Sequence, residues 1–394
     1  MINQKMRELG AKRSVIRELF EYGKKRKSEV GEQNVFDFSL GNPSVPAPKE
    51  VNPVLERLLR EEDSVKLHGY TSAEGDLSVR RAIAEYINRT EGEEIRPECV
   101  YMTVGAAAAL TISLKALVSP GEEVITYAPY FPEYKVFVEA TGAKLIEVPG
   151  RDSDLLLDIE SIKAHINEKT AAVMINSPNN PTGVVFDEEN IKALSDMLRQ
   201  MSKKLGRTIY LISDEPYREL VYDEVKVPYV TKYYDDTLVC YSFSKSLSIP
   251  GERIGYIVIS PRINDFPSVR AAVAGAGRAL GFVCAPSMLQ RLVAEFLGKT
   301  SDISVYDKNR RLLLSSLTEY GYEVIKPQGA FYLFIKSPSG DGVEFSERAK
   351  RMDILLVPSD DFGIPGYVRL SYCVKTETIE RALPIFKKLI ESYR

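Results

Sequence analysis

The sequence has no tryptophan, only two histidines and only four cysteines among its 394 residues. The only histidines are His68 and His165. This scarcity argues against a zinc site and against a histidine-based catalytic triad. The cysteines lie far apart and form no Cys-x-x-Cys pair; they are Cys99, Cys240, Cys284 and Cys373. We therefore expect no bound metal.

Charge of one sign and long apolar runs are also in short supply. Lys and Arg number 52 against 55 Asp and Glu, which leaves a net charge of −3. Without a basic excess there is no field to hold a phosphate backbone, so we expect no nucleic-acid partner. No apolar run reaches the length of about eighteen residues that a membrane span needs, so we expect no membrane partner. The N-terminal MINQKMRELGAKR lacks the apolar stretch of a signal peptide, which favours a cytoplasmic protein.

One basic run stands out, GKKRK at residues 23–27. It falls within a predicted amphipathic helix at residues 14–30. The apolar stripe of that helix comprises Val15, Ile16, Leu19 and Phe20. We interpret the basic run as the solvated face of this helix rather than as a nucleic-acid patch.

From about residue 100 the chain alternates short apolar runs with longer amphipathic ones. Several short runs are continuously apolar, which is typical of strands buried on both faces of a sheet. The expected strands are residues 100–103, 124–127, 145–148, 171–176, 209–213, 238–242 and 254–260. The expected helices between them are residues 106–118, 132–141 and 188–205. This alternation predicts an α/β fold, a three-layer sandwich with a mostly parallel sheet.

The C-terminal part has a different pattern, which predicts a smaller α+β domain. Its expected strands are residues 331–336, 354–357 and 368–372, its expected helices are 343–351 and 376–391, and the segment 309–320 joins it to the large domain. We predict three parts in the chain. Residues 1–48 belong to the small domain, 49–300 form the large domain, and 301–394 complete the small one.

Polar residues follow three of the predicted buried strands. In an open α/β sheet, ligands bind outside the carboxyl ends of the strands, so these side chains are expected to converge. They are Asn180, Asp214, Tyr217, Ser242, Ser244 and Lys245. Arg253 comes shortly after them, and the start of the helix at Gly105, Ala106 and Ala107 offers free amides to an anion. Singly each feature has a plain structural explanation, but the joint pattern is hard to obtain by chance.

The residues that carry a resemblance are those around the lysine, SFSKSLSIPGERIGY, with serines before Lys245, Arg253 eight residues after it, and then Gly-Tyr. With them the sequence resembles the fold-type I, pyridoxal-phosphate-dependent aminotransferases of class I/II, the aspartate aminotransferase superfamily. The similarity extends from Gly41, in Gly-Asn-Pro, to Arg369 in YVRLSY. It implies pyridoxal 5'-phosphate as cofactor and an enzyme of the transaminase class.

The resemblance also implies a role for each residue. Lys245 forms a Schiff base with the cofactor aldehyde and then acts as the base, while Asp214 pairs with the pyridine nitrogen. Tyr217 and Asn180 hydrogen-bond the cofactor's phenolic oxygen, and Phe131 stacks on its ring. The residues implied to hold the phosphate are Gly105, Ala106, Ala107, Ser242, Ser244 and Arg253. Arg369 holds the substrate α-carboxylate, with Gly41 and Asn180 beside it.

Two implied residues concern a second subunit and the substrate. Tyr70 matches a tyrosine that reaches the neighbour's phosphate, which implies a homodimer with shared active sites. Arg278 lies near the position of a cross-subunit arginine that reads a distal carboxylate, and an interface role for it is an equal alternative. Ala107 stands where aspartate-specific relatives have a lysine. We therefore expect a relaxed donor range that includes neutral amino acids.

The leading hypothesis is an aminotransferase that exchanges an amino group between an L-amino acid and a 2-oxo acid through a pyridoxamine form of the cofactor. The alternative is a carbon–sulfur β-lyase of the same fold, because the cofactor-binding residues are largely shared. A remote alternative is a non-enzymatic regulatory module, which needs a DNA-binding domain that the forty or so residues before Gly41 do not resemble.

Overall fold

The computed structural model describes residues 2–11, 14–151 and 153–394. A seven-stranded sheet with the order β2-β8-β7-β6-β5-β3-β4 lies at its centre. All neighbouring strands are parallel except β8, which runs antiparallel to both β2 and β7. The strands are β2 (Val100–Thr103), β3 (Glu123–Ala128), β4 (Lys144–Pro149), β5 (Thr170–Asn176), β6 (Tyr210–Asp214), β7 (Thr237–Ser242) and β8 (Gly255–Ile259).

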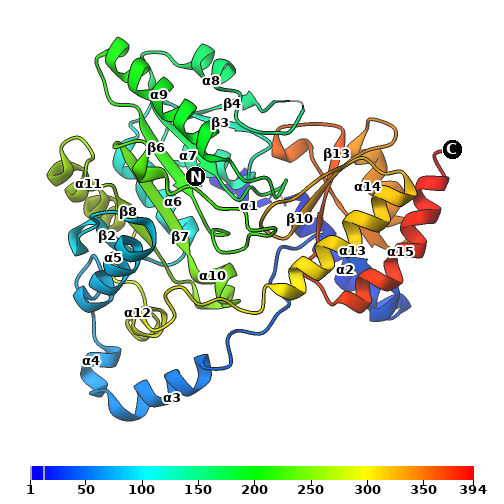
Figure 1. The fold of residues 1–394 in the computed structure, drawn as a ribbon, viewed down its shortest axis with the longest axis horizontal. Coiled ribbons are helices and arrows are strands. Elements are labelled where there is room, and N and C mark those ends of the chain that lie inside the picture. The colour runs from blue at the N-terminus through cyan, green and yellow to red at the C-terminus, as the bar shows by residue number, and fades with distance from the viewer. Residues whose placement is uncertain (1, 12–13, 152) are drawn as a thin grey trace.

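Helices cover both faces of this sheet, which confirms the predicted three-layer α/β sandwich (Figure 1). On one face lie α6 (Ala106–Leu117), α7 (Glu133–Ala140) and α11 (Phe266–Ala279). The other face is covered by α3 (Val51–Glu61), α5 (Leu77–Glu91), α8 (Ile159–His165), α9 (Glu188–Leu205) and α12 (Ser287–Ala294). Two short helices, α4 (Ser64–His68) and α10 (Phe243–Ser246), complete this part.

Local sequence signals explain where the long helices begin and end. The Asp187 side chain accepts a hydrogen bond from the Asn190 amide and caps α9, which ends at Gly206 with φ 65°. α5 follows the same scheme, with Asp76 as the cap and Gly92 at φ 68°. An N-cap carboxylate and a left-handed glycine satisfy the free amides and carbonyls at the two helix ends.

A four-stranded antiparallel sheet with the order β12-β13-β10-β9 forms the centre of the smaller α+β unit. Its strands are β9 (Val324–Ile325), β10 (Tyr332–Lys336), β12 (Val357–Pro358) and β13 (Tyr367–Ser371), and its helices are α13 (Ser304–Tyr320), α14 (Gly342–Lys350) and α15 (Thr376–Glu391). The N-terminal strand β1 (Phe36–Asp37) pairs in parallel with β11 (Ile354–Leu355). Figure 1 shows the dark-blue N-terminal helix α2 beside the yellow to red C-terminal helices.

The N-terminal segment is anchored to this unit by α2 (Val15–Val30), which matches the helix predicted at residues 14–30 and has Ser14 as its N-cap. The helix α1 (Gln4–Ala11) precedes it. Leu19 is buried against Val357 and Phe362. Phe20, assigned to the apolar stripe, is 41% exposed, so that part of the prediction is wrong. The basic run is only partly solvated, because Arg26 forms an ion pair with Asp353 at 2.7 Å.

One further prediction needs correction. The strand expected at residues 354–357 is two short strands in different sheets, since β11 pairs with β1 and β12 with β13. The linking segment at residues 309–320 is the C-terminal part of α13, which begins at Ser304 and packs on α15. The residue boundaries of the domains stay a prediction. Among the helices of the described ranges, none has the length and apolarity to span a bilayer.

We expect Leu19→Ala to lower the free energy of unfolding by about 2–4 kcal/mol, because it leaves a cavity between α2 and the small unit. Chemical denaturation measures this change. Phe20→Ala, one residue along the same helix but exposed, is the matched control and should cost under about 1 kcal/mol. Equal losses in both variants would contradict this packing.

Candidate active site

The parallel strands β5, β6 and β7 end side by side at Asn176, Asp214 and Ser242. A cavity of about 290 Å³ opens at this edge. Its lining includes most of the predicted residues: Gly41, Ala106, Ala107, Phe131, Asn180, Asp214, Tyr217, Ser242, Ser244, Lys245, Arg253 and Arg369. The sheet thus brings together residues that are far apart in the sequence, as the strand-end argument predicts.

Lys245 lies in the short helix α10, directly after β7. Its Nζ donates a hydrogen bond to the Gly41 carbonyl at 2.6 Å. Burial lowers the pKa of Lys245 to about 8, with Arg253 and Arg369 adding to the effect and Cys373 opposing it. Roughly a tenth to a fifth of this amine is therefore neutral and nucleophilic near physiological pH, far more than of an exposed lysine.

Asp214 is 5% exposed at the end of β6. Its Oδ2 accepts a hydrogen bond from the Tyr134 hydroxyl at 2.6 Å, while the buried Oδ1 has no partner. Burial raises the pKa of this carboxyl to about 7; the Tyr134 bond lowers it and Glu215 raises it further. A buried acceptor without a partner suits a cationic or N–H group of a bound molecule.

Arg369 comes from β13 of the small unit and is buried. Its Nη1 donates to Asn180 Oδ1 at 3.0 Å and its Nη2 to the Ser39 carbonyl at 2.6 Å, while Nε has no partner. The guanidinium lies 4.7 Å from the centre of the Tyr332 ring and 5.1 Å from that of Phe362. Its partners are neutral, so the positive charge is free to bind a carboxylate.

Two tyrosines and two asparagines complete the polar wall. Tyr217 and Tyr332 share a hydrogen bond between their hydroxyls at 2.8 Å. The backbone N–H of Asn180 donates to Asn176 Oδ1 at 2.7 Å, and this hydrogen bond orients the loop after β5. Gly41 is required beside them, because a Cβ there would overlap the Tyr332 hydroxyl.

An anion-binding corner lies at the start of α6. No side chain caps this helix, whose N-cap is Gly105 with φ 86°. Its first amides therefore remain free and carry the positive end of the helix dipole. A Cβ on Gly105 would come within 2.9 Å of Arg253 Nη2, so the glycine lets the guanidinium approach. Ser242 and Ser244 share a hydrogen bond at 2.7 Å, and Arg253 Nη1 donates to Ser244 Oγ at 3.5 Å.

Three predicted residues do not line the cavity. Gly105 lies next to it, as the N-cap of α6 beside Arg253. Tyr70 is 98% exposed, and Arg278 is exposed on α11. Sequence reasoning also missed several site residues: Ile16, Ser39, Tyr134, Asn176 and Tyr332. Asn176 had a usable signal, since it ends a buried strand. Tyr134 and Tyr332 had none, because a helical tyrosine and a strand tyrosine are ordinary core residues.

The model of aminotransferase class I and II matches residues 33–386. The chain belongs to this family. Members use pyridoxal 5'-phosphate, so the protein is a pyridoxal-phosphate-dependent aminotransferase, and the lyase alternative is not favoured. The residues fit the cofactor, because the unpartnered Asp214 oxygen, a buried amine and an anion-binding corner face one cavity.

Curated relatives match over most of their length. A probable aspartate/prephenate aminotransferase of Thermus aquaticus is 32% identical, covering 90% of this chain and 91% of the relative. The aspartate aminotransferase of Thermotoga maritima is 31% identical, covering 91% and 92%. Among solved structures, an aminotransferase from Eubacterium rectale has a TM-score of 0.98 at 54% identity, covering 100% and 99%. Aspartate aminotransferase from Thermus thermophilus with maleate has a TM-score of 0.85 at 27% identity, covering 99% and 100%.

We expect Lys245 of the cofactor-free chain to react with cyanate with a midpoint near pH 8, because only the neutral amine is a nucleophile. Peptide mass spectrometry after brief labelling across a pH series gives this midpoint. Lys336 is the internal control, since Glu323 raises its pKa and its labelling should rise at higher pH. Parallel profiles for the two lysines would contradict the assigned pKa of Lys245.

Proposed function

We propose that this cavity transfers amino groups between an L-amino acid and a 2-oxo acid, with Lys245 and Asp214 as the central residues. The observation that supports this most is the pairing of a neutral-tending amine with an unpartnered carboxylate oxygen in one cavity. When bound, pyridoxal 5'-phosphate supplies an aldehyde for the amino group and a ring that withdraws electrons. The remaining steps depend on the chain's own side chains.

Lys245 would hold the cofactor and, as a free amine, would remove the proton from the substrate Cα. Its Nζ donates to the Gly41 carbonyl at 2.6 Å. Asp214 would keep the ring nitrogen of the cofactor protonated through its free Oδ1, while Tyr134 fixes the other oxygen. Tyr217 and Asn180 would hydrogen-bond the phenolic oxygen of the cofactor, and Phe131 would pack against its ring.

The cofactor phosphate and the substrate α-carboxylate would bind to separate arginines. Arg253, Ser242, Ser244 and the first amides of α6 hold the phosphate, since they form one donor-rich corner. Arg369 holds the substrate α-carboxylate beside Asn180 and Gly41. This separation orients the substrate so that its Cα faces Lys245.

We further propose a relaxed donor range. The cations that line the described cavity are Lys245, Arg253 and Arg369, all engaged in the roles above. The cavity also has apolar wall residues, which are Ile16, Leu110, Phe131 and Phe137. Such walls suit neutral side chains. Three of the relatives are named aspartate aminotransferases. Dicarboxylic donors are therefore included, with Arg278 of a second subunit as the group that reads the distal carboxylate.

The proposal therefore includes a cytoplasmic homodimer. Tyr70 and Arg278 are exposed in the single chain. Since an exposed tyrosine ring leaves a large apolar area in water, a subunit interface explains it better than solvent does. In the dimer Tyr70 reaches the phosphate of the neighbouring site.

Borohydride treatment of the holoenzyme should leave the cofactor covalently attached to the Lys245 peptide, as read by mass spectrometry. The treated enzyme should lose its transaminase activity and keep its fold. Lys245→Ala should retain no attached cofactor after the same treatment. Attachment to a different lysine would overturn the assigned site.

Arg278→Ala should lower kcat/KM for aspartate or glutamate by about 10- to 150-fold, the equivalent of about 1.5–3 kcal/mol for a charge-assisted contact, and leave alanine little changed. Arg81→Ala, another exposed helical arginine, is the control and should affect neither donor. An equal loss of kcat/KM for both donors would show that Arg278 supports the structure and does not read the distal carboxylate. Separately, a protein that sediments as a fully active monomer would exclude the shared active site.

A further inference from the structure

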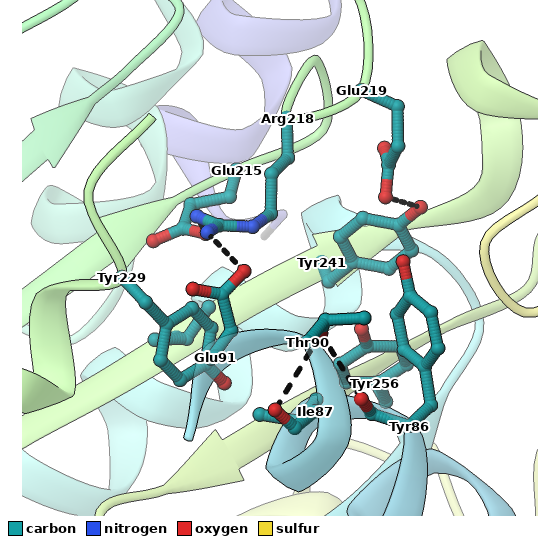
Figure 2. A pocket seen from close by; sticks show the side chains of 11 residues that line it. Tyr86, Ile87, Thr90, Glu91, Glu215, Arg218, Glu219, Tyr229, Tyr241 and Tyr256 are labelled. Carbon is teal, nitrogen blue, oxygen red and sulfur yellow. Dashed lines mark hydrogen bonds and ion pairs between the residues drawn. The ribbon is translucent and has the colours of Figure 1, made fainter. Parts of the chain in front are cut away.

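A second, much smaller cavity of about 20 Å³ lies behind the end of β6. Figure 2 shows the side chains around it, which come from α5, from the segment after β6 and from β7 and β8. Four charged residues line it: Glu91, Glu215, Arg218 and Glu219. Four tyrosines also line it: Tyr86, Tyr229, Tyr241 and Tyr256. None of these residues lines the larger cavity.

Glu215 connects the two cavities because it directly follows Asp214. Adjacent residues of an extended strand point to opposite faces, and here Asp214 lines the large cavity while Glu215 lines the small one. The extended pairing continues through Glu215, whose amide donates to the Cys240 carbonyl at 2.9 Å. The Glu215 side chain is therefore fixed just across the sheet from the Asp214 carboxyl.

The Glu215 carboxylate is 1% exposed and fully engaged. Its Oε1 accepts from Ser213 Oγ at 2.8 Å and its Oε2 from Arg218 Nη1 at 2.9 Å. Burial raises the pKa of Glu215, whereas Arg218 and Ser213 oppose that rise by stabilising the charged form. The carboxylate is thus a buried negative charge with a dedicated partner.

Arg218 is held from several sides, so it cannot move away from Glu215. Its Nη2 donates to Glu91 Oε1 at 2.9 Å and to the Val227 carbonyl at 3.1 Å. Its guanidinium lies 4.8 Å from the centre of the Tyr229 ring. In Figure 2 the guanidinium lies between Glu215 and Glu91. Glu91 also pairs with Lys232, whose Nζ lies 3.3 Å from its Oε2, so Arg218 is not the only cation that Glu91 contacts.

Three cations line the same cavity as Asp214: Lys245, Arg253 and Arg369. Three further titratable groups near Asp214 carry no charge near neutral pH. They are Tyr134 of α7, Tyr217 of the following loop and Cys240 of β7, and burial raises the pKa of each. Among the acids, Glu215 acts on Asp214, and its charge raises the pKa of that carboxyl. A more basic Asp214 holds a proton on a cationic partner more firmly.

We propose that Glu215 and Arg218 are positioning residues for the active site: Glu215 adds negative potential to Asp214 through the sheet, and Arg218 fixes and partly balances that charge. This inference rests on the proposed role of Asp214 as partner of the ring nitrogen. The two adjacent acids at the end of β6 thus have different roles. Asp214 would contact the cofactor, and Glu215 would change the electrostatic potential at Asp214 from the opposite face of the sheet.

The test is the titration of Asp214 in the cofactor-free chain, followed by ¹³C NMR of the carboxyl carbon and assigned by its loss in Asp214→Asn. Glu215→Gln keeps the shape and one acceptor oxygen but removes the charge and one of the two accepted hydrogen bonds. We expect the Asp214 midpoint, near pH 7 in the unmodified chain, to move down by less than about one pH unit, because burial rather than Glu215 accounts for most of the raised pKa. Glu93→Gln is the matched control, because Glu93 is also buried and paired with an arginine but lines neither cavity. Its midpoint should not move.

Arg218→Lys keeps the charge and should stay near the unmodified value. In the holoenzyme, Glu215→Gln should move the ¹⁵N shift of the cofactor ring nitrogen toward the unprotonated form. An unchanged Asp214 midpoint in Glu215→Gln, or an equal shift in Glu93→Gln, would overturn the proposal. Because this titration needs no cofactor, it can fail while borohydride still labels Lys245.

Discussion

A buried guanidinium joins three distant parts of the chain at the active site. Arg369 belongs to the small unit, yet it donates to Asn180 of the large unit and to the Ser39 carbonyl of the N-terminal segment. A buried charge with neutral partners is costly unless an anion completes it. The rings of Tyr332 and Phe362 offset part of that cost, since a guanidinium close to an aromatic ring is stabilised. The buried Arg369 guanidinium thus both joins the two units and requires a carboxylate ligand. A bound substrate carboxylate therefore stabilises the junction of the two units, because it binds only the folded chain.

The strand-end argument from the sequence predicted the central site residues because it rests on a property of parallel sheets. Asp214 and Ser242 end adjacent strands, and Lys245 follows Ser242 by three residues, so their proximity requires only that both strands be buried and parallel. Arg369 could not be placed by that argument, because it lies on an antiparallel strand of the small unit. Its assignment came from family resemblance.

The contacts that sequence reasoning missed depend on packing between distant elements. Tyr134 looks like a core residue of α7, and only the docking of α7 on the sheet turns its hydroxyl toward Asp214. Residues 354–357 form a plausible single strand, but the chain changes sheets between Leu355 and Val357 because β1 returns from the N-terminus to pair there. Phe20 follows the helical stripe, and the narrow contact of α2 leaves it outside. Local periodicity gives the face of a helix but not the width of the surface that it meets.

Burial shifts the pKa values of Asp214 and Lys245 in opposite directions. Burial disfavours the charged form of each, so the pKa of Asp214 rises to about 7 and that of Lys245 falls to about 8. Folding therefore opposes ionisation of Asp214 above roughly pH 4, the pKa of an unfolded aspartate, and that cost reaches its full size above pH 7. It likewise opposes protonation of Lys245 below about pH 10, with the full cost below pH 8. Both costs, each about a few kcal/mol, apply in full between about pH 7 and pH 8, so the cofactor-free cavity destabilises the folded chain most in that range. A ligand that bonds covalently to the amine and brings a cation to the carboxylate relieves both at once. The instability of the empty site is thus the same free energy that favours cofactor binding.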